Sequence, residues 1–282
     1  MSLAANHFPA GKLAAIARHA VLIVTGLMVL APFLWMLILS AKSPQDMFTD
    51  GISLLPRDLS FIGNYRRALT ATPLARYMLN GVIVCGSILA LQIVVAAPCA
   101  YALSKLRFYG RDLIFALVLV GLILPHQVLF LPLFILAARL GILDSYAALI
   151  LPYAVSPFGI FLFRQFFRTI PDDIVHAARL DGLSEAAIVW RIMVPMALPA
   201  LVAFSIFSIV AHWNDLFWPL IAVHSQELMP PSLGVVAFKN EEAGSDYGAL
   251  MAAATIVVSP LLVAFLLAQR WFIDGLTAGA VK

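Results

Sequence analysis

Residues Pro171 to Pro199 read PDDIVHAARLDGLSEAAIVWRIMVPMALP, and they form a charged, amphipathic segment in a chain that is otherwise mostly apolar. Two aspartates follow Pro171, and both a proline and negative charge favour the first turn of a helix. Gly182 can adopt the left-handed conformation that ends a helix, and Ser184 can cap the helix that follows. The segment therefore predicts two short helices separated by Asp181-Gly182.

The composition around this segment is that of a membrane protein. Of the 282 residues, 62% are hydrophobic and 12% are charged, whereas about a quarter of the residues of a soluble domain are charged. Apolar stretches of about 20 residues are long enough to cross a bilayer as helices. We predict an all-α, polytopic membrane protein that forms a single transmembrane domain over residues 1–282, with the charged segment in the loop 164–198. The six predicted spans are 20–41, 79–103, 113–137, 145–163, 199–222 and 247–268.

The distribution of positive charge indicates the orientation of these spans. Eleven Lys and Arg residues lie on the termini and on the loops 104–112 and 164–198, whereas seven lie on the opposite side of the predicted membrane. Since loops rich in Lys and Arg stay in the cytoplasm, both termini and the charged segment are predicted to be cytoplasmic. The long segments 42–78 and 223–246 then face the opposite, non-cytoplasmic side of the membrane.

A helix-turn-helix at the cytoplasmic face is suited to docking on a soluble partner, and Ala177 and Ala178 give it a small, smooth patch.

The chain has no Walker motif, because the Gly11-Lys12 pair is followed by Leu and lacks the upstream Gly. If the activity of the protein is driven by ATP, another polypeptide must therefore bind the ATP and Mg, and we expect no cofactor in this chain. The net charge of +3 is spread along the sequence without a basic, aromatic-rich cluster, which argues against nucleic acid as a partner.

Several motifs carry a family resemblance over most of the chain. HAARLDG at 176–182, followed by Ile192 and Pro195, resembles the Glu-Ala-Ala loop of bacterial ABC importer permeases. FGIFLFRQFF at 158–167, Trp-Asn-Asp at 213–215 and GLTAGAVK at 275–282 look like the carbohydrate-uptake branch, of the maltose-permease type. His176 stands where that family usually has Glu.

The resemblance implies a subunit in a bacterial inner membrane that moves a sugar or sugar-like solute from the periplasm to the cytoplasm. Its implied partners are a second homologous permease, a dimer of ATPase subunits, a periplasmic sugar-binding protein and the lipid bilayer. By position, the 223–246 loop would reach into the binding protein, and the tail around Gly275, Leu276 and Gly279 would lie against the ATPases. The residues assigned to ATPase coupling are Asp173, His176, Ala177, Ala178, Asp181, Gly182 and Ser184.

Two polar clusters interrupt the predicted spans. Pro125-His126-Gln127 lies in the third span, and His212-Trp213-Asn214-Asp215 lies in the fifth. At the helical rise, both histidines lie about 18–20 Å from the cytoplasmic edge of the bilayer core. Since interrupted spans commonly mark a transport path, we hypothesise that these clusters line or close it on the outer side. In the alternative interpretation, the fifth span ends near His212 and its polar residues are interfacial. The path or gate residues are His126, Gln127, His212, Trp213 and Asn214.

Two other polar side chains, Asn80 and Gln92, lie in the second predicted span. Because unpaired polar groups are unfavourable at that depth, we expect both to form hydrogen bonds with neighbouring helices.

Other functional classes remain as alternatives. Ser208 and His212, four residues apart, could meet as in an intramembrane serine hydrolase, but no third group is evident, so no catalytic residue is assigned. His212 and Asp215 lack further metal ligands, so no metal site is assigned either. A secondary transporter needs acidic groups within its spans, and the middles of the six predicted spans contain none.

Within the importer class, a polyol or glycerol phosphate is the alternative cargo. The absence of central Arg and Lys favours a neutral solute.

Overall fold

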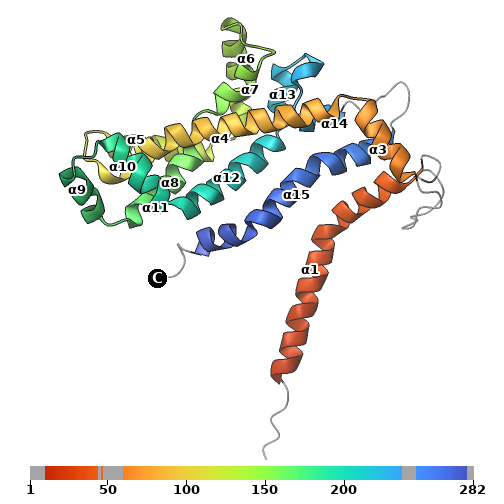
Figure 1. The fold of residues 1–282 in the computed structure, drawn as a ribbon, viewed down its shortest axis with the longest axis horizontal. Helices are drawn as coiled ribbons and strands as arrows, with labels where there is room; N and C mark the ends of the chain where they lie inside the picture. Colours follow the sequence, from red (N-terminus) through yellow and green to blue (C-terminus); the bar gives the residue numbers. More distant parts are fainter. Residues whose placement is uncertain (1–9, 44–45, 47–59, 237–245, 278–282) are drawn as a thin grey trace, which may run out of the picture. The chain divides into compact units, whose positions relative to one another are not determined.

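The computed structural model describes residues 10–43, 46, 60–236 and 246–277 (Figure 1). Within these ranges the chain is helical and contains no β-strand, which confirms the all-α prediction. The chain divides into two compact units, one made of Met1–Ala68 with Phe238–Thr255 and the other of Leu69–Ala237 with Ile256–Lys282. We call them unit 1 and unit 2 and describe each separately.

Three helices contain segments that are by themselves long and apolar enough to cross a bilayer. They are α1 (Ala10–Ala41), α4 (Leu74–Lys105) and α15 (Tyr247–Thr277), and the qualifying segments are Ala14–Ala41, Leu74–Lys105 and Tyr247–Leu267. Three further pairs qualify only when their bent halves are joined, which allows up to six spans among the described residues.

The bent pairs differ in the angle between their halves. The first joins α5 (Arg111–Ile123) to η1 (His126–Leu129) and α6 (Phe130–Arg139) at 100°. The second joins α7 (Tyr146–Ile150) and η2 (Leu151–Tyr153) to α8 (Pro157–Thr169) at 42°. The third joins α10 (Glu185–Ile188), the π-helical η3 (Val189–Met193) and α11 (Val194–Met196) to α12 (Leu198–Trp213) at 83°. The remaining helices are α3 (Phe61–Thr70), α9 (Asp172–Leu180), α13 (Phe217–Ala222), η4 (Gln226–Leu228) and α14 (Pro231–Val236).

Both polar clusters coincide with helix breaks. Leu124, the residue before Pro125, has an extended backbone, because the proline ring disfavours the helical conformation there. In the predicted 199–222 stretch, α12 ends at Trp213 and α13 begins at Phe217. The Asp215 carboxylate accepts a hydrogen bond from the Trp218 backbone N–H at 3.4 Å, as a residue at a helix start can. The third and fifth apolar stretches are therefore each divided into separate helices.

The core of unit 2 is built where α4 packs along α8 and α12 (Figure 1). Alanines of α4 make this contact close, because small side chains let helix backbones approach. A Cβ added to Gly159 of α8 would lie 2.8 Å from the Phe204 ring of α12 and 3.3 Å from the Ala96 Cβ. The same cluster contains buried Ala96, Ala97 and Ala100 of α4, Phe163 and Phe167 of α8, and Phe204 of α12.

Unit 1 is held by a buried asparagine. The Asn64 amide of α3 donates hydrogen bonds to the backbone carbonyls of Ser40 and Lys42, both at 2.8 Å. Arg67 donates to the Asn64 side-chain oxygen at 2.6 Å and forms an ion pair with Asp246 at 2.7 Å. One asparagine thereby joins the end of α1 to α3.

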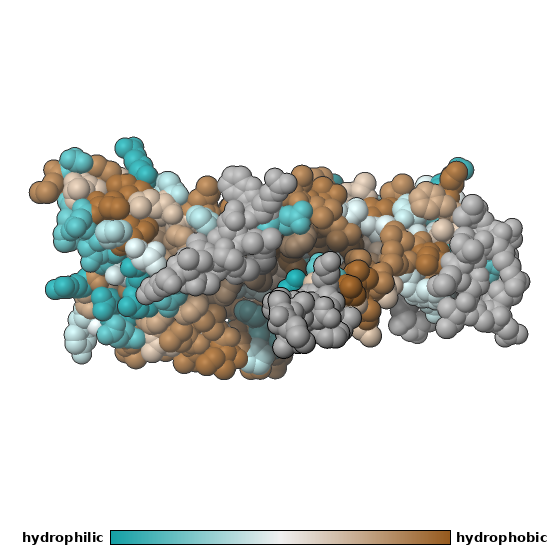
Figure 2. All heavy atoms as spheres, turned by 90° about the horizontal axis from the view of Figure 1, so that it is seen from below, coloured by the Kyte–Doolittle hydropathy of each residue, from teal (hydrophilic) through white to brown (hydrophobic). Residues whose placement is uncertain are grey.

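Large hydrophobic side chains cover much of the exposed surface. Most apolar residues of α1 between Val21 and Leu37 are more than one-third exposed, and no residue of α5 is buried. Figure 2 shows hydrophilic side chains gathered at the part of unit 2 that carries α9 and α10. This distribution is expected for helices that face lipid, with a polar cap in water.

We predict that Gly159→Ala destabilises the protein, because the new methyl group would press on the Phe204 ring, which is buried against Phe163. Overpacking of this kind costs about 1–3 kcal/mol. Gly86→Ala in α4 is the matched control, since nothing lies within 4 Å of its added Cβ. Thermal unfolding in detergent should show a lower Tm for Gly159→Ala and an unchanged or higher Tm for Gly86→Ala. Equal Tm values would contradict this account of the α4–α8–α12 contact.

Candidate functional site

The predicted helix-turn-helix is present at the polar end of unit 2. Helix α9 begins at Asp172, directly after Pro171, and ends at Leu180. Gly182 has a φ of +79°, the left-handed conformation that glycine adopts without steric cost. Ser184 caps α10, because its hydroxyl oxygen accepts a hydrogen bond from the Ala187 N–H at 3.3 Å. The break and the cap thus lie at the residues that the sequence indicates.

Helix α9 has one face toward the protein and one toward solvent. Val175 and Ala178 are buried in the α4–α8 core. Four exposed residues occupy the opposite face at helical spacing, and Leu180 among them is 89% exposed. We call these residues the outward face of α9; they are Asp173, His176, Ala177 and Leu180. Of the two alanines assigned to docking, Ala177 therefore points outward and Ala178 inward.

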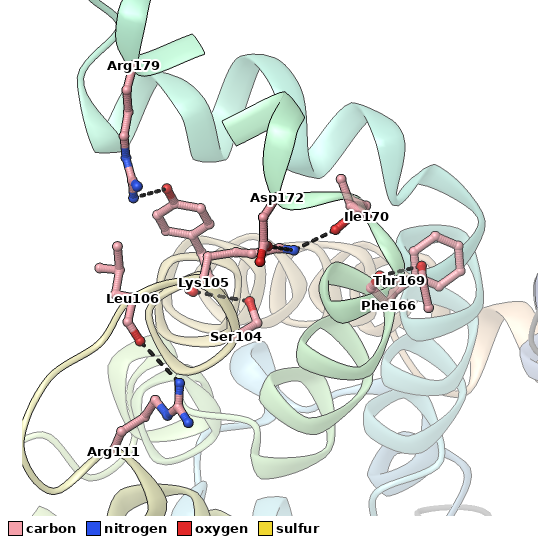
Figure 3. Close-up of polar contacts among 10 residues, drawn as sticks. Ser104, Lys105, Leu106, Arg111, Phe166, Thr169, Ile170, Asp172 and Arg179 are labelled. Atoms are coloured by element: carbon pink, nitrogen blue, oxygen red, sulfur yellow. Dashed lines mark hydrogen bonds and ion pairs between the residues drawn. The ribbon is translucent and has the colours of Figure 1, made fainter. Parts of the chain in front are cut away.

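The start of α9 is tied to the last turn of α4 (Figure 3). The Lys105 ammonium donates hydrogen bonds to the Ile170 carbonyl and to the Asp172 carboxylate, both at 2.5 Å. The Lys105 side chain is only 4% exposed, whereas that of Asp172 is 71% exposed. The hydrogen bond from Lys105 lowers the pKa of Asp172 below its usual range, so the carboxylate is charged at neutral pH and the ion pair is lost as the pH falls through that lowered pKa.

The end of α9 is also tied to α4, through Tyr101 instead of Lys105. Arg179 forms two hydrogen bonds with the Glu185 carboxylate of α10, at 2.8 and 3.2 Å. The Tyr101 hydroxyl of α4 donates to that carboxylate at 2.5 Å and accepts a hydrogen bond from Arg179 at 3.4 Å. A two-point Arg–carboxylate contact fixes orientation as well as distance.

The sequence does not predict roles for Tyr101, Lys105, Arg179 or Glu185. Two signals nevertheless point to them. Tyr101 and Lys105 are four residues apart at the end of an apolar helix, and therefore share one face. Arg179 and Glu185 are opposite charges on either side of the turn at Gly182.

A buried arginine adds to the rigidity of this end. Arg164 of α8 donates to the Leu103 carbonyl of α4 at 3.1 Å, and its guanidinium lies 3.6 Å from the centroid of the Phe115 ring of α5. A guanidinium over an aromatic face is favourable, more so when it is shielded from water. Arg164 thereby links three helices beneath α9.

A second polar cluster surrounds Gln92 within α4. Its amide nitrogen donates to the Tyr153 carbonyl at 2.9 Å and lies 3.2 Å from Nε2 of His212, and its oxygen accepts from the Ser208 hydroxyl at 2.6 Å. The expectation that Gln92 bonds to neighbouring helices is met. Ser208 and His212 both contact Gln92, and the Ser208 hydroxyl donates to the glutamine rather than to the histidine. This is not the geometry of an activated serine nucleophile.

The predicted gate residues divide into two groups. His212 is half-buried with its ring 4.5 Å from that of Tyr153, and Trp213 is buried with its indole N–H donating to the Val257 carbonyl at 3.0 Å. His126, Gln127 and Asn214 are exposed. The structure thus brings His212 and Trp213 into the packed interior of unit 2 and leaves the other three on its surface. Among the described residues, no group of three or more His, Cys, Asp or Glu side chains is arranged to hold a metal ion.

The segment after α13 is held by two side chains of unit 2. Asn80 donates to the carbonyls of Glu227 and Met229 at 2.8 and 2.9 Å, and it accepts from the Tyr146 hydroxyl at 2.7 Å. Asp144 accepts from the backbone N–H groups of the two residues that follow Val223, at 3.0 and 2.8 Å. The tip of the predicted 223–246 loop, including Glu241 and Glu242, lies outside the described residues, as does Gly279 of the tail.

The sequence and the fold are similar to those of known transport proteins. Residues 83–277 match the family described as binding-protein-dependent transport system inner membrane component. The arabinooligosaccharide transport permease AraQ of Bacillus subtilis is 32% identical over 98% of this chain and 99% of its own length. The diacetylchitobiose uptake permease NgcG of Streptomyces coelicolor is 34% identical over 94% of this chain and 88% of its own. The sn-glycerol-3-phosphate permease UgpE of Yersinia pestis is 31% identical over 92% and 94%.

Solved structures agree with the fold. A chain of a bacterial ABC transporter involved in importing the acidic polysaccharide alginate superposes with a TM-score of 0.83 at 23% identity, over 95% of this chain and all of that chain. A chain of the MetNI methionine ABC transporter superposes with a TM-score of 0.56 at 15% identity, over 72% of this chain and 95% of that one. The family match and the relatives that align over nearly the whole chain show that the chain belongs to the inner membrane components of binding-protein-dependent transport systems.

Proposed function

We propose that this chain is one transmembrane subunit of an ATP-driven importer, and that the helix-turn-helix α9–α10 is where a separate ATPase docks. The observation that supports this most strongly is the outward face of α9. It stays exposed while the opposite face of the helix is buried and both ends of the helix are tied to α4. An 89% exposed Leu180 beside a small Ala177 on a well-anchored helix has the character of a docking surface.

The proposed cargo is a sugar or a short oligosaccharide. Relatives that align over nearly the whole chain are named for arabinooligosaccharides and diacetylchitobiose, which are neutral carbohydrates. The similarity to a glycerol-3-phosphate permease supports the second candidate, a phosphorylated polyol. The neutral cargo is favoured because the predicted mid-span regions contain no Lys or Arg to pair with a phosphate.

The assembly would contain a second, homologous permease, two ATPase subunits that bind ATP and Mg, and a periplasmic solute-binding protein. In the proposed orientation both termini and α9 are cytoplasmic, so α9 lies on the side where ATP is present. Closure of the ATPase dimer would move α9, and this movement would open the path toward the binding protein. ATP hydrolysis would take place in the partner, and this chain would carry out no covalent chemistry.

The outer gate of the path is proposed to involve the two helix breaks, at Pro125 and after Trp213. His126, Gln127 and Asn214 are exposed at these breaks and can face a path, whereas His212 and Trp213 support them from inside. Polar groups at interrupted spans are typical of the substrate paths of transporters.

We expect the chain, purified in mild detergent from its native membrane, to retain a second permease and an ATPase. In proteoliposomes the complex should hydrolyse ATP faster when the binding protein is loaded with an arabinooligosaccharide or diacetylchitobiose than with glycerol 3-phosphate. Stimulation by glycerol 3-phosphate alone would select the second cargo. A chain that retains no ATPase would contradict the proposed function.

We predict that Leu180→Asp weakens ATPase binding by about tenfold or more, because an apolar anchor at an interface becomes a charge. Since Leu180 is 89% exposed, the change should leave the isolated chain folded. Tyr109→Asp is the control, a fully exposed aromatic residue in the turn before α5. Binding of the purified ATPase to immobilised permease measures both. Equal binding by the two variants would place the docking surface elsewhere.

A third prediction concerns the gate. In a chain whose Cys85 and Cys99 are replaced by alanine, His126→Cys and Asn214→Cys should react with a membrane-impermeant maleimide at rates that differ severalfold between nucleotide-free and ATP-bound complexes. Leu140→Cys is the control, because it is exposed at the end of α6 away from both breaks. Unchanged rates at 126 and 214 would show that the breaks do not take part in gating.

A further inference from the structure

The polar contacts of α9 converge on a single spanning helix. Lys105 binds the start of α9, and Tyr101 binds the pair formed by Arg179, at the end of α9, and Glu185, at the start of α10. Tyr101 and Lys105 are one helical turn apart on α4. One face of α4 therefore holds α9 at both ends.

Both donors on α4 are shielded from water. Tyr101 is 2% exposed, and the Lys105 side chain is 4% exposed. Hydrogen bonds shielded from water are stronger than exposed ones, and leaving such a donor unpaired is unfavourable. An arrangement in which α9 moves away from α4, so that Tyr101 and Lys105 lose their partners, is therefore disfavoured.

The remaining contacts of α9 with the core are apolar. Val175 and Ala178 pack against the α4–α8 cluster, and such packing is not directional. Hydrogen bonds weaken steeply when their angle or length changes. The polar ties, rather than the apolar packing, thus fix the direction in which α9 can pull on the protein.

Helix α4 also leads to the groups at the far side of unit 2. It is continuous over 32 residues. Gln92, which contacts His212, lies nine residues from Tyr101, or about 14 Å along the axis. Asn80, which binds the carbonyls of Glu227 and Met229, lies about 32 Å from Tyr101. A displacement of the end of α4 would reach both the polar cluster around Gln92 and the segment after α13 that contains Glu227 and Met229.

We propose that Tyr101 and Lys105 are positioning residues that clamp α9 to α4 at two points, so that movement of the docked ATPase is transmitted into α4. The proposal rests on the proposed function, because it assigns the route by which α9 acts on the path. Loosening the clamp leaves the ATPase docked through the outward face of α9 but separates ATP hydrolysis from transport.

The main variant is Tyr101→Phe, which removes the hydroxyl bonded to Glu185 and Arg179 and keeps the ring. Its matched control is Tyr146→Phe, which removes the hydroxyl bonded to Asn80, away from α9. The complex is reconstituted in proteoliposomes with radiolabelled arabinooligosaccharide or diacetylchitobiose, whichever the wild type imports. Solute imported per ATP hydrolysed should fall about tenfold or more for Tyr101→Phe, because the variant loses the hydrogen bonds of the hydroxyl with two charged groups, while ATPase binding stays unchanged. Tyr146→Phe should keep the wild-type ratio.

A second measurement does not depend on transport. Hydrogen exchange of the purified single chain should speed up in α9 and α10 for Tyr101→Phe and for Lys105→Met, but not for Tyr146→Phe. Exchanging the charges in an Arg179→Glu, Glu185→Arg double variant should restore slow exchange that either single change loses, because the two side chains can pair in either order.

The import ratio, the exchange rates and ATPase binding together distinguish a failure of the clamp from a failure of the proposed function. Faster exchange in α9 with an unchanged import ratio would overturn transmission through Tyr101. Unchanged exchange in both α4 variants would overturn the clamp itself. A wild-type chain that binds no ATPase would contradict the proposed function, whatever the exchange data show.

Discussion

The close contact between α4 and α8 is the constraint on which the rest of unit 2 depends. A membrane offers little hydrophobic gain for bringing two apolar helices together, so close packing must supply the attraction. Ala96 and Gly159 let the two backbones approach until the Phe204 ring of α12 fills the remaining space. With these helices fixed, the polar end of α4 and the start of α9 are brought within hydrogen-bonding distance.

Polar side chains then specify how the other segments are arranged around this contact. Within unit 2, Asn80, Gln92 and Tyr101 lie at three depths along α4, and each binds a different segment. Such groups are unfavourable in an apolar medium unless they are paired, which makes wrong arrangements unfavourable as well. The apolar packing holds the helices together, and the polar groups select one arrangement among many that would bury similar area.

The same division underlies the proposed coupling of this subunit to a soluble partner. The outward face of α9 has few contacts with its own chain, so it is available for docking, while both ends of the helix are tied to α4. A freely attached loop would absorb the movement of a docked protein. In the proposed mechanism, a loop fixed at two points passes that movement to the spanning helix.

The sequence by itself determined the class of the fold, because long apolar stretches and the Asp181-Gly182 break follow from local chemistry and the bilayer thickness. It also indicated the helix breaks near Pro125 and His212, since proline and polar groups act locally on a helix. The sequence did not distinguish Ala177 from Ala178, because which face of α9 is buried depends on the helices beneath it. Nor did it pair Tyr101 with Glu185, 84 residues apart, or Gln92 with His212, 120 residues apart. Those contacts were decided by the tertiary structure, because partners so distant in sequence meet only when the packing of α4, α8 and α12 has set their positions.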